Sequence, residues 1–308
     1  MIEKTAIVGM GALGLLYADI ITSAKGPDAV TFVMDDERLE KYRNRNFTFN
    51  GEKRVFHMEA AENAKPADLV IVAVKYNGLE SAIDTMSTSV GEDTVIMSVM
   101  NGIDSEKKIA ARYGWGHTID AIAQGMDAMR FGDDLTCTHR GQLCIGMERE
   151  EQRENLEKVV RFFQEIHMPY TEESDILHRM WAKFMMNVGV NQACAAFETD
   201  YAGTLEEGSD ANRIMLAAMR EVIALANSEG IGLTEKDLDE YVALERTLDP
   251  KGMPSMRQDT FAGRPSELEM FAGTVIRMAE QKGIQVPANR ELYQRIEEIE
   301  RKNGVRER

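Results

Sequence analysis

The sequence has few cysteines, a shortage of basic residues and no long apolar run, and each lack excludes a class of protein. Its three cysteines, Cys137, Cys144 and Cys194, are too few and too scattered for a disulfide framework, which favours a reducing compartment. Cys137 and Cys144 flank His139, but their spacing matches no common zinc pattern. We therefore expect ordinary strand residues there and no metal site.

Basic residues are outnumbered, since 36 lysines and arginines face 52 aspartates and glutamates, for a formal net charge of -16. Nucleic-acid binding needs a basic face, and no long cluster of Lys and Arg occurs, so a nucleic-acid partner is not expected. No apolar run approaches the ~20 residues that span a bilayer, and the first apolar strand starts too close to Met1 to leave room for a signal peptide. We expect a cytoplasmic protein with no membrane partner.

What the sequence does have is length and a glycine motif near its start. At 308 residues it is long enough for two domains. The apolar run 5–8 leads into Gly9, Gly11 and Gly14, spaced G-x-G-x-x-G, and an apolar helical pattern follows. The order of strand, tight turn and helix predicts a dinucleotide site, although glycine-rich turns also occur for purely conformational reasons.

Each part of this motif has a separate expected role. Gly9 permits the turn, Gly11 lets the backbone approach a pyrophosphate, and Gly14 lets the helix pack close to the strand. The phosphates are expected on the free N–H groups that begin the helix, at Ala12 and Leu13, where the helix dipole is positive.

The second predicted strand, 29–34, is followed by Asp35. In a βαβ unit the residue about 20 positions past the glycines meets the adenosine ribose, and an acidic side chain there accepts hydrogen bonds from a 2′-hydroxyl and repels a 2′-phosphate. Asp35 therefore favours NAD(H) over NADP(H). Two alternatives stay open, because Asp35 also fits as the cap of the next helix, and Arg38 or Lys41 could still bend round to a phosphate.

Two further apolar runs, 67–74 and 94–100, are continuous, as in strands buried on both faces of a parallel sheet. The first ends in Lys75 and the second in Asn101. Open α/β sheets bind ligands at the carboxyl ends of their strands, so we expect both side chains at the cofactor site. The alternatives are a solvated strand end for Lys75 and a turn residue for Asn101.

Shorter patterns predict the rest of the chain. In the first domain, 1–172, we expect strands at 47–49 and 55–58 around a turn at Asn50-Gly51, an antiparallel pair at 135–138 and 142–145, a helix at 151–166 and a last strand at 168–171. In the second domain, 173–308, we expect helices at 176–197, 211–229, 235–248, 267–282 and 288–301. The predicted fold class is an α/β domain followed by an all-helical domain.

In the first long helix of the second domain, Lys183, Asn187 and Asn191 stand four residues apart, which places three polar side chains on one face. Partial burial would move the pKa of Lys183 toward the working range of a proton donor. The alternative is an exposed polar stripe on a helix that covers the core.

Further along, Ser255 is a candidate for donating to a substrate carboxylate, and Glu267 for contacting a substrate hydroxyl or Lys183. These two segments also have structural alternatives. Ser255 could cap a helix that begins near Met256, and Ser266 could form a capping box with Glu269.

Together these motifs resemble the ketopantoate reductase (2-dehydropantoate 2-reductase) family along nearly the whole chain. No single motif is decisive, and the order and spacing carry the resemblance. The matching features are Gly9-Met10-Gly11-Ala12-Leu13-Gly14, Val74-Lys75, Asn101-Gly102, Trp181-Ala182-Lys183 with Asn187 and Asn191, Ser255-Met256-Arg257-Gln258-Asp259 and Ser266-Glu267-Leu268-Glu269.

The resemblance implies a Rossmann-type domain followed by a helical domain, with the active site in the cleft between them. It implies NADP(H) as cofactor and a small 2-keto acid, 2-dehydropantoate, as the substrate reduced to pantoate on the way to coenzyme A. The lysine that matches Lys183 acts as general acid, and the glutamate that matches Glu267 binds and orients the substrate. Positions matching Asn101, Asn187, Asn191 and Ser255 hold polar groups of substrate or cofactor, and Lys75 lies near the nicotinamide.

The chain departs from the family pattern at two places. Asp35 stands where members usually carry a basic residue for the NADP 2′-phosphate, and a substrate-contacting asparagine is replaced near Tyr201. Two alternatives therefore stay open: an NAD(H)-dependent dehydrogenase of other branched 2-hydroxy acids, and a dinucleotide-sensing protein without catalysis. The methionines of the helical domain could serve a homodimer interface or core packing; they are Met215, Met219, Met270 and Met278.

Overall fold

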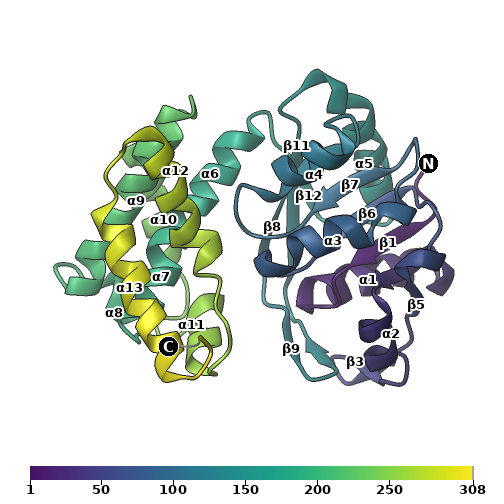
Figure 1. The fold of residues 1–308 in the computed structure, drawn as a ribbon, viewed down its shortest axis with the longest axis horizontal. Coiled ribbons are helices and arrows are strands. Elements are labelled where there is room, and N and C mark those ends of the chain that lie inside the picture. The colour runs from purple at the N-terminus through teal and green to yellow at the C-terminus, as the bar shows by residue number, and fades with distance from the viewer. Residues whose placement is uncertain (307–308) are drawn as a thin grey trace. The chain divides into compact units, whose positions relative to one another are not determined.

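The computed structural model describes residues 1–306 of the chain. The chain folds into two compact units, Met1–Ile176 and the part from Leu177 onward. Figure 1 shows the first unit as a sheet with helices on it and the second as a set of helices. The fold class predicted from the sequence, a Rossmann-type α/β domain followed by a helical domain, is confirmed.

The strands all lie in the first unit, as far as the chain is described. They are β1 (Thr5–Val8), β2 (Val30–Met34), β3 (Phe47–Phe49), β4 (Glu52–Arg54), β5 (His57–Ala60), β6 (Leu69–Val72), β7 (Val95–Ser98), β8 (Thr118–Met126), β9 (Met129–Phe131), β10 (Asp134–Thr136), β11 (Arg140–Gly146) and β12 (Tyr170–Glu172).

The helices of the first unit are α1 (Ala12–Lys25), α2 (Asp36–Tyr42), α3 (Leu79–Thr85), α4 (Ser105–Tyr113) and α5 (Arg153–Glu165), with short 3₁₀ turns η1 (Pro27–Ala29), η2 (Ala61–Asn63), η3 (Tyr76–Gly78), η4 (Ser87–Ser89) and η5 (Glu150–Gln152). Those of the second are α6 (Ile176–Met186), α7 (Gln192–Ala196), α8 (Tyr201–Leu205), α9 (Asp210–Ser228), α10 (Glu235–Glu245), α11 (Ser255–Phe261), α12 (Thr274–Lys282) and α13 (Pro287–Lys302), with π-helical turns η6 (Asn187–Asn191) and η7 (Glu269–Gly273).

The main sheet has eight strands in the order β12-β11-β8-β7-β6-β1-β2-β5. The six strands from β8 to β5 are parallel, while β11 is antiparallel to β8. The chain builds β1 and β2 toward one edge and then crosses back to add β6 and β7 on the other side of β1. The order therefore reverses between β1 and β6, which is where open α/β sheets bind their ligands.

Continuous apolar runs form the central strands because both faces of the sheet are covered. All four residues of β6 are buried, and their side chains alternate between two cores. Leu69 and Ile71 pack on the side of α1 and α5, whereas Val70 and Val72 pack on the side of α3 and α4. The strand is thus held from both sides, which fixes the position of its carboxyl end.

One strand prediction is wrong. The segments 135–138 and 142–145 do not pair with each other: β10 joins a separate four-stranded sheet, β4-β3-β10-β9, while β11 pairs with β8 and β12. The chain leaves one sheet for the other at Thr138 and His139, whose backbone N–H groups both donate to Asp127 Oδ1 at 2.8 Å. This carboxylate replaces the ladder hydrogen bonds of the expected hairpin.

A second strand was displaced in the prediction. The turn at Asn50-Gly51 is present, but β4 ends at Arg54, and the chain then switches sheets to form β5, so no single strand covers 55–58. Phe56 lies at the switch, and its ring packs edge-on against Phe32 of the main sheet at 5.5 Å between centroids. The ring is partly buried against the core of the main sheet, next to the point where the strand breaks.

Candidate active site

The glycine-rich turn lies at the carboxyl end of β1, and its three glycines differ in what a side chain would meet. Gly9 has a φ of +110°, and a Cβ there would lie 2.4 Å from the carbonyl oxygen of Ala73. A Cβ at Gly14 would lie 2.0 Å from the carbonyl oxygen of Gly9. At Gly11 the nearest atom would be Ala73 O at 3.8 Å, an ordinary contact. The protein itself therefore requires glycine at the first and third positions, whereas space is open at Gly11, as a phosphate group would need.

Helix α1 begins directly after this turn, with Gly11 as its N-cap residue. No side chain caps the helix and no acidic residue occupies its first turn. The N–H groups of the first turn, among them those of Ala12 and Leu13, have no partner within the helix, and the positive end of the helix dipole lies there. This end of the 14-residue helix α1 thus has the chemistry of an anion site and fits a dinucleotide pyrophosphate.

Asp35 follows β2, and the structure shows it as the N-cap of α2. Its Oδ1 accepts a hydrogen bond from the backbone N–H of Arg38 at 2.8 Å, and its Oδ2 pairs with the guanidinium of the same arginine. The capping alternative is therefore present. Its carboxylate is still 41% exposed, so a contact with the adenosine ribose stays a prediction.

Lys75 and Asn101 follow the neighbouring strands β6 and β7, whose last residues, Val72 and Ser98, are register partners. Lys75 is exposed and precedes η3, whereas Asn101 is partly buried in the loop before α4. Both positions lie at the carboxyl edge of the sheet, to which Gly9 also belongs. The first unit thus brings its predicted cofactor residues to one edge.

Beneath the loop of Asn101 the structure places buried carboxylates that the sequence did not indicate. Ser105 donates to Glu106 Oε2 at 2.9 Å, while Glu106 Oε1 has no hydrogen-bond partner among residues 1–306. Burial, reinforced by the charge of Asp120, raises the pKa of Glu106 to about 8. Burial also raises the pKa of Asp120 to about 7, although Gln152 donates to it at 2.9 Å.

In the second unit, α6, η6 and α7 form one continuous helix that carries Lys183, Asn187 and Asn191. Asn187 and Asn191 are buried, so the alternative of an exposed stripe does not describe them, and Lys183 is partly buried. Asn191 Nδ2 donates to Asn187 Oδ1 at 3.3 Å, which confirms that these two share a face. Asn187 Nδ2 is buried and has no hydrogen-bond partner among the described residues. Since buried polar atoms are normally paired, this donor is available to a ligand.

The π-helical turn η6 spans Asn187 to Asn191 and changes the geometry of this face. In a regular α-helix, residues four positions apart differ by about 40° around the axis, so three side chains spaced in this way do not stay in line. The wider π turn has more residues per turn, and it reverses part of this rotation. Such turns occur frequently at functional sites.

The side chain of Gln192 joins this turn to the second π turn, η7. Its Nε2 donates to the carbonyl oxygen of Val188 at 2.8 Å and to Asn289 Oδ1 at 3.2 Å, and its Oε1 accepts from the backbone N–H of Ala272 at 3.0 Å. Gln192 and Asn289 are both completely buried. Asn289 in turn donates to Glu221 at 2.8 Å, so one polar network ties α7, η7, α9 and α13 together.

Glu267 lies two residues before η7, and its carbonyl oxygen accepts the N–H groups of Met270 and Phe271 at 3.0 and 3.1 Å. Ser255 is exposed and is the first residue of α11, with Pro254 at the N-cap, so Ser255 is not the cap. Its role in binding substrate stays a prediction.

The predicted capping box of Ser266 and Glu269 is absent. Glu269 instead accepts hydrogen bonds from Tyr293 at 2.6 Å and Arg306 at 3.0 Å, which lower the pKa of its carboxyl against the effect of burial. Ser266 Oγ is buried and has no hydrogen-bond partner among the described residues. The sequence pattern could not show that Tyr293 of α13 and Arg306 beyond its end are the partners of Glu269.

The methionines Met215, Met219 and Met270 are buried, which supports core packing, whereas Met278 is partly buried. A homodimer stays a prediction. Among residues 1–306, no three His, Cys, Asp or Glu side chains come together as a metal ion would require. No helix in that part of the chain is long and apolar enough to cross a membrane.

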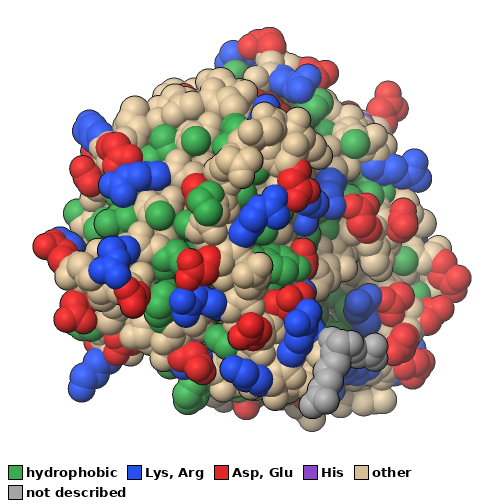
Figure 2. Space-filling view, turned by 60° about the vertical axis from the view of Figure 1, so that its left-hand side comes forward, with side chains coloured by type: hydrophobic (Ala, Val, Ile, Leu, Met, Phe, Trp, Pro, Cys, Tyr) green, Lys and Arg blue, Asp and Glu red, His purple; other side chains and the backbone are tan. Residues whose placement is uncertain are grey.

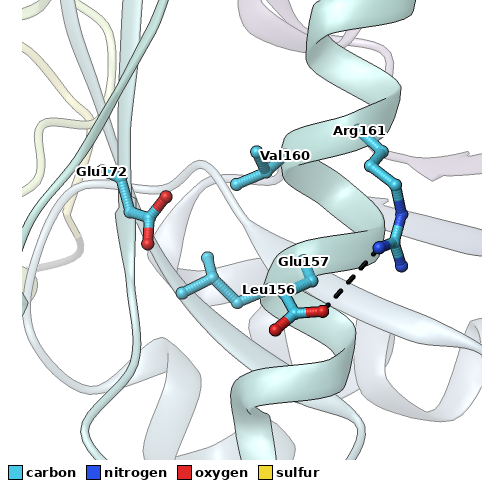
Figure 3. Close-up of a pocket in the computed structure, with 5 residues that line it drawn as sticks. All are labelled: Leu156, Glu157, Val160, Arg161 and Glu172. Atoms are coloured by element: carbon cyan, nitrogen blue, oxygen red, sulfur yellow. Dashed lines mark ion pairs between the residues drawn. The ribbon is translucent and has the colours of Figure 1, made fainter.

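Two surface features were considered as ligand sites, and neither indicates one. The face drawn in Figure 2 has acidic and basic side chains interspersed, with no large area of one sign. A hollow on α5 is lined by Leu156, Glu157, Val160, Arg161 and Glu172, and Glu157 pairs with Arg161 at 3.7 Å (Figure 3). It lies at edge strand β12, five strands from β1, or about 24 Å across the sheet, and thus far from the glycine-rich turn.

Comparison with known proteins was made for both units. The family model described as ketopantoate reductase PanE/ApbA matches residues 5–135, and the model of the C-terminal part of the same family matches residues 175–300. The 2-dehydropantoate 2-reductase of Aquifex aeolicus is 27% identical over 94% of this chain and 94% of its own length.

Solved structures of similar fold cover nearly the whole chain. A PanE/ApbA family ketopantoate reductase from Ralstonia eutropha superposes with a TM-score of 0.80 at 23% identity, covering 98% of this chain and 99% of its own. A D-mandelate dehydrogenase, solved with NADH and anilino(oxo)acetate, has a TM-score of 0.84 at 19% identity. The match covers 98% of this chain and 100% of the dehydrogenase chain. Both likenesses show the fold.

Proposed function

We propose that this chain, which belongs to the ketopantoate reductase family and is therefore an oxidoreductase acting on a CH–OH group, reduces 2-dehydropantoate to pantoate with a nicotinamide dinucleotide. The observation that carries the proposal is the match of both units, in order, to the two models of this one family. The family's reductases depend on NAD(P)H. In this proposal the step belongs to the synthesis of pantothenate and coenzyme A.

The first unit would hold the dinucleotide. Gly11 leaves space for the pyrophosphate, the N–H groups of Ala12 and Leu13 donate to it, and Gly9 and Gly14 keep the turn and helix in place. Lys75 and Asn101 are proposed to contact the cofactor from the adjacent strand ends. When bound, the nicotinamide supplies the hydride that adds to the keto carbon.

The second unit would supply the proton and hold the substrate. Hydride addition places negative charge on the keto oxygen, and a positioned ammonium group stabilises that charge and releases a proton to it. We assign this role to Lys183. Asn187, with its unpaired buried Nδ2, and Asn191 are assigned to polar groups of the substrate, together with Ser255, and Glu267 to orienting it. The product is the 2-hydroxy acid.

A second candidate is an NAD(H)-dependent dehydrogenase of other branched 2-hydroxy acids. Asp35 favours it, because a carboxylate at this place disfavours a 2′-phosphate and remains partly exposed. A D-mandelate dehydrogenase of similar fold has been solved with NADH bound.

Steady-state kinetics with the purified full-length protein separates the two candidates. 2-Dehydropantoate and other branched 2-keto acids are each assayed with NADH and with NADPH. We expect the highest kcat/KM with 2-dehydropantoate. Negligible turnover of this substrate beside efficient reduction of another 2-keto acid would contradict the first candidate and support the second.

A further inference from the structure

Arg130 of β9 reaches the glycine-rich turn from a distant part of the sequence. Its Nη1 donates to the carbonyl oxygen of Met10, the residue between Gly9 and Gly11, across 120 positions of the chain. The side chain is only 16% exposed. A cation is therefore fixed against the backbone on which the phosphates of the dinucleotide are expected.

Two aromatic rings and a carbonyl group hold this guanidinium in place. Its carbon lies 5.4 Å from the ring centre of Tyr42 on α2 and 5.6 Å from that of Phe47 on β3. Nε donates to the carbonyl oxygen of Gly132 at 2.8 Å. These contacts restrict the side chain before any ligand binds, so little conformational entropy is lost when it makes a further hydrogen bond.

The guanidinium still has donors to offer. Of its five N–H groups, one is taken by Gly132 and one by Met10. The Nη2 group faces Asp133 Oδ1 at 3.8 Å, beyond hydrogen-bond distance, and that oxygen already accepts from Arg45 at 2.8 Å. Within the described part of the chain, the remaining donors have no hydrogen-bond acceptor. A fixed, partly buried fork of this kind matches the oxygens of a phosphate group.

The first turn of α1 has no charged residue, so it offers no cation of its own to a phosphate group. Arg38 is engaged by Asp35. We propose that Arg130 binds a phosphate group of the dinucleotide, either its pyrophosphate or the 2′-phosphate of NADP(H), and is a cofactor-binding residue of this site. The inference rests on the proposed function, because it requires that the turn bind a dinucleotide.

The test is a binding titration that needs no turnover. NADH and NADPH are titrated separately into the full-length wild type, Arg130→Gln and Arg130→Lys, with nucleotide fluorescence or heat as the readout. Arg45→Gln is the matched control, because Arg45 lies at the same 5.4 Å from the Tyr42 ring and pairs with Asp133, but is not hydrogen-bonded to the turn.

We expect Arg130→Gln to raise the Kd by about tenfold, because one charge-assisted hydrogen-bond pair is lost. The Kd of Arg130→Lys should lie between those of Arg130→Gln and the wild type. Equal losses for both nucleotides identify the pyrophosphate, and a loss for NADPH alone identifies the 2′-phosphate. Arg45→Gln should stay within about twofold. Thermal unfolding without ligand checks that each variant folds, and Arg130→Lys serves as the test if Arg130→Gln does not.

Unchanged Kd values for both nucleotides in a folded Arg130 variant would overturn the assignment. So would an equal loss in Arg45→Gln, because the effect would then be one of general surface charge. If the wild type binds neither nucleotide, the proposed function itself fails, which is a different result from a wild type that binds and an Arg130 variant that binds equally well.

Discussion

At the scale of single residues, the three glycines of the turn separate a requirement of the fold from one of the ligand. Gly11→Ala adds a methyl group that meets no protein atom closer than 3.8 Å, in an extended backbone conformation that any residue adopts. We expect its free energy of unfolding to change by less than about 1 kcal/mol and its dinucleotide Kd to rise by about tenfold. Urea unfolding and nucleotide titration measure the two effects.

Gly14→Ala is the matched control, since its methyl group would lie 2.0 Å from the carbonyl oxygen of Gly9. Here we expect a loss of stability of about 1–3 kcal/mol, as in other overpacked sites. If Gly11→Ala binds nucleotide like the wild type, the turn does not hold the pyrophosphate.

Lys183 is the residue on which the proposed chemistry depends. Lys183→Ala removes the group that would protonate the substrate oxygen, so kcat should fall by about 10²–10⁴, while the Kd for nucleotide stays nearly unchanged. Lys236→Ala, at an exposed ion pair on α10, provides the comparison and should retain full activity. Undiminished turnover in Lys183→Ala would show that another group donates the proton.

Asp35 can be tested without disturbing its helix. Asn caps a helix as well as Asp does, so Asp35→Asn keeps the hydrogen bond to the Arg38 N–H and removes only the charge. If the carboxylate discriminates against a 2′-phosphate, the affinity ratio of NADPH to NADH should rise several-fold in titrations with both nucleotides. An unchanged ratio would mean that Asp35 acts only as the cap.

At the scale of elements, long apolar runs could be predicted and distant pairings could not. β6 and β7 follow from continuous apolar sequence because both of their faces are covered. The small sheet joins β3 to β10 by pairing Thr48 with Asp134. Strands of three residues carry too little periodicity to reveal such a partner.

The same limit applies to the candidate site. Lys183, Asn187 and Asn191 are visible as a four-residue spacing, and the glycines as a motif. The π turns leave no trace in hydrophobic periodicity, and Arg130 is far in sequence from the turn that it contacts. These features depend on tertiary contacts, which a local pattern does not encode.

Gln192 links the two π turns and offers a test at this scale. Gln192→Leu keeps the approximate volume but leaves the N–H of Ala272 and the oxygen of Asn289 without this partner. We expect a loss of about 2–4 kcal/mol in urea unfolding, because buried polar groups remain unpaired. Gln164→Leu, at an exposed glutamine bonded to Tyr170, should change stability by less than about 0.5 kcal/mol. Equal stability of the two variants would contradict a structural role for the network.

At the scale of the whole molecule, buried carboxyl groups make stability depend on pH. Glu106 has a pKa raised to about 8, and Glu245 in the second unit one raised to about 7. A raised pKa means that the folded state binds the proton more tightly than the unfolded chain. The stabilisation is present below the ordinary carboxyl range and is lost as pH rises through these values.

We therefore expect the free energy of unfolding to fall between about pH 5 and pH 8, and Glu106→Gln to flatten this fall because an amide does not ionise. Denaturant unfolding across this pH range measures the slope. Glu80→Gln, at an exposed carboxylate paired with Lys108, should leave the slope unchanged. A Glu106→Gln variant with the wild-type slope would show that another group is responsible.

The helix that runs from Ile176 to Ala196 owes its register to the one wide turn at its middle. A π turn holds one residue more than an α-helical turn, so it takes up the extra residue without turning the helix on either side. Deleting one residue within it, such as Gly189, would let an ordinary α-helix close and leave Gln192 beside its present partners. Deleting one residue from the regular part of α6 would instead rotate everything beyond it by about 100° and carry Gln192 away from Ala272 and Asn289. The wide turn is thus the one place in this helix where a change of length by one residue stays local.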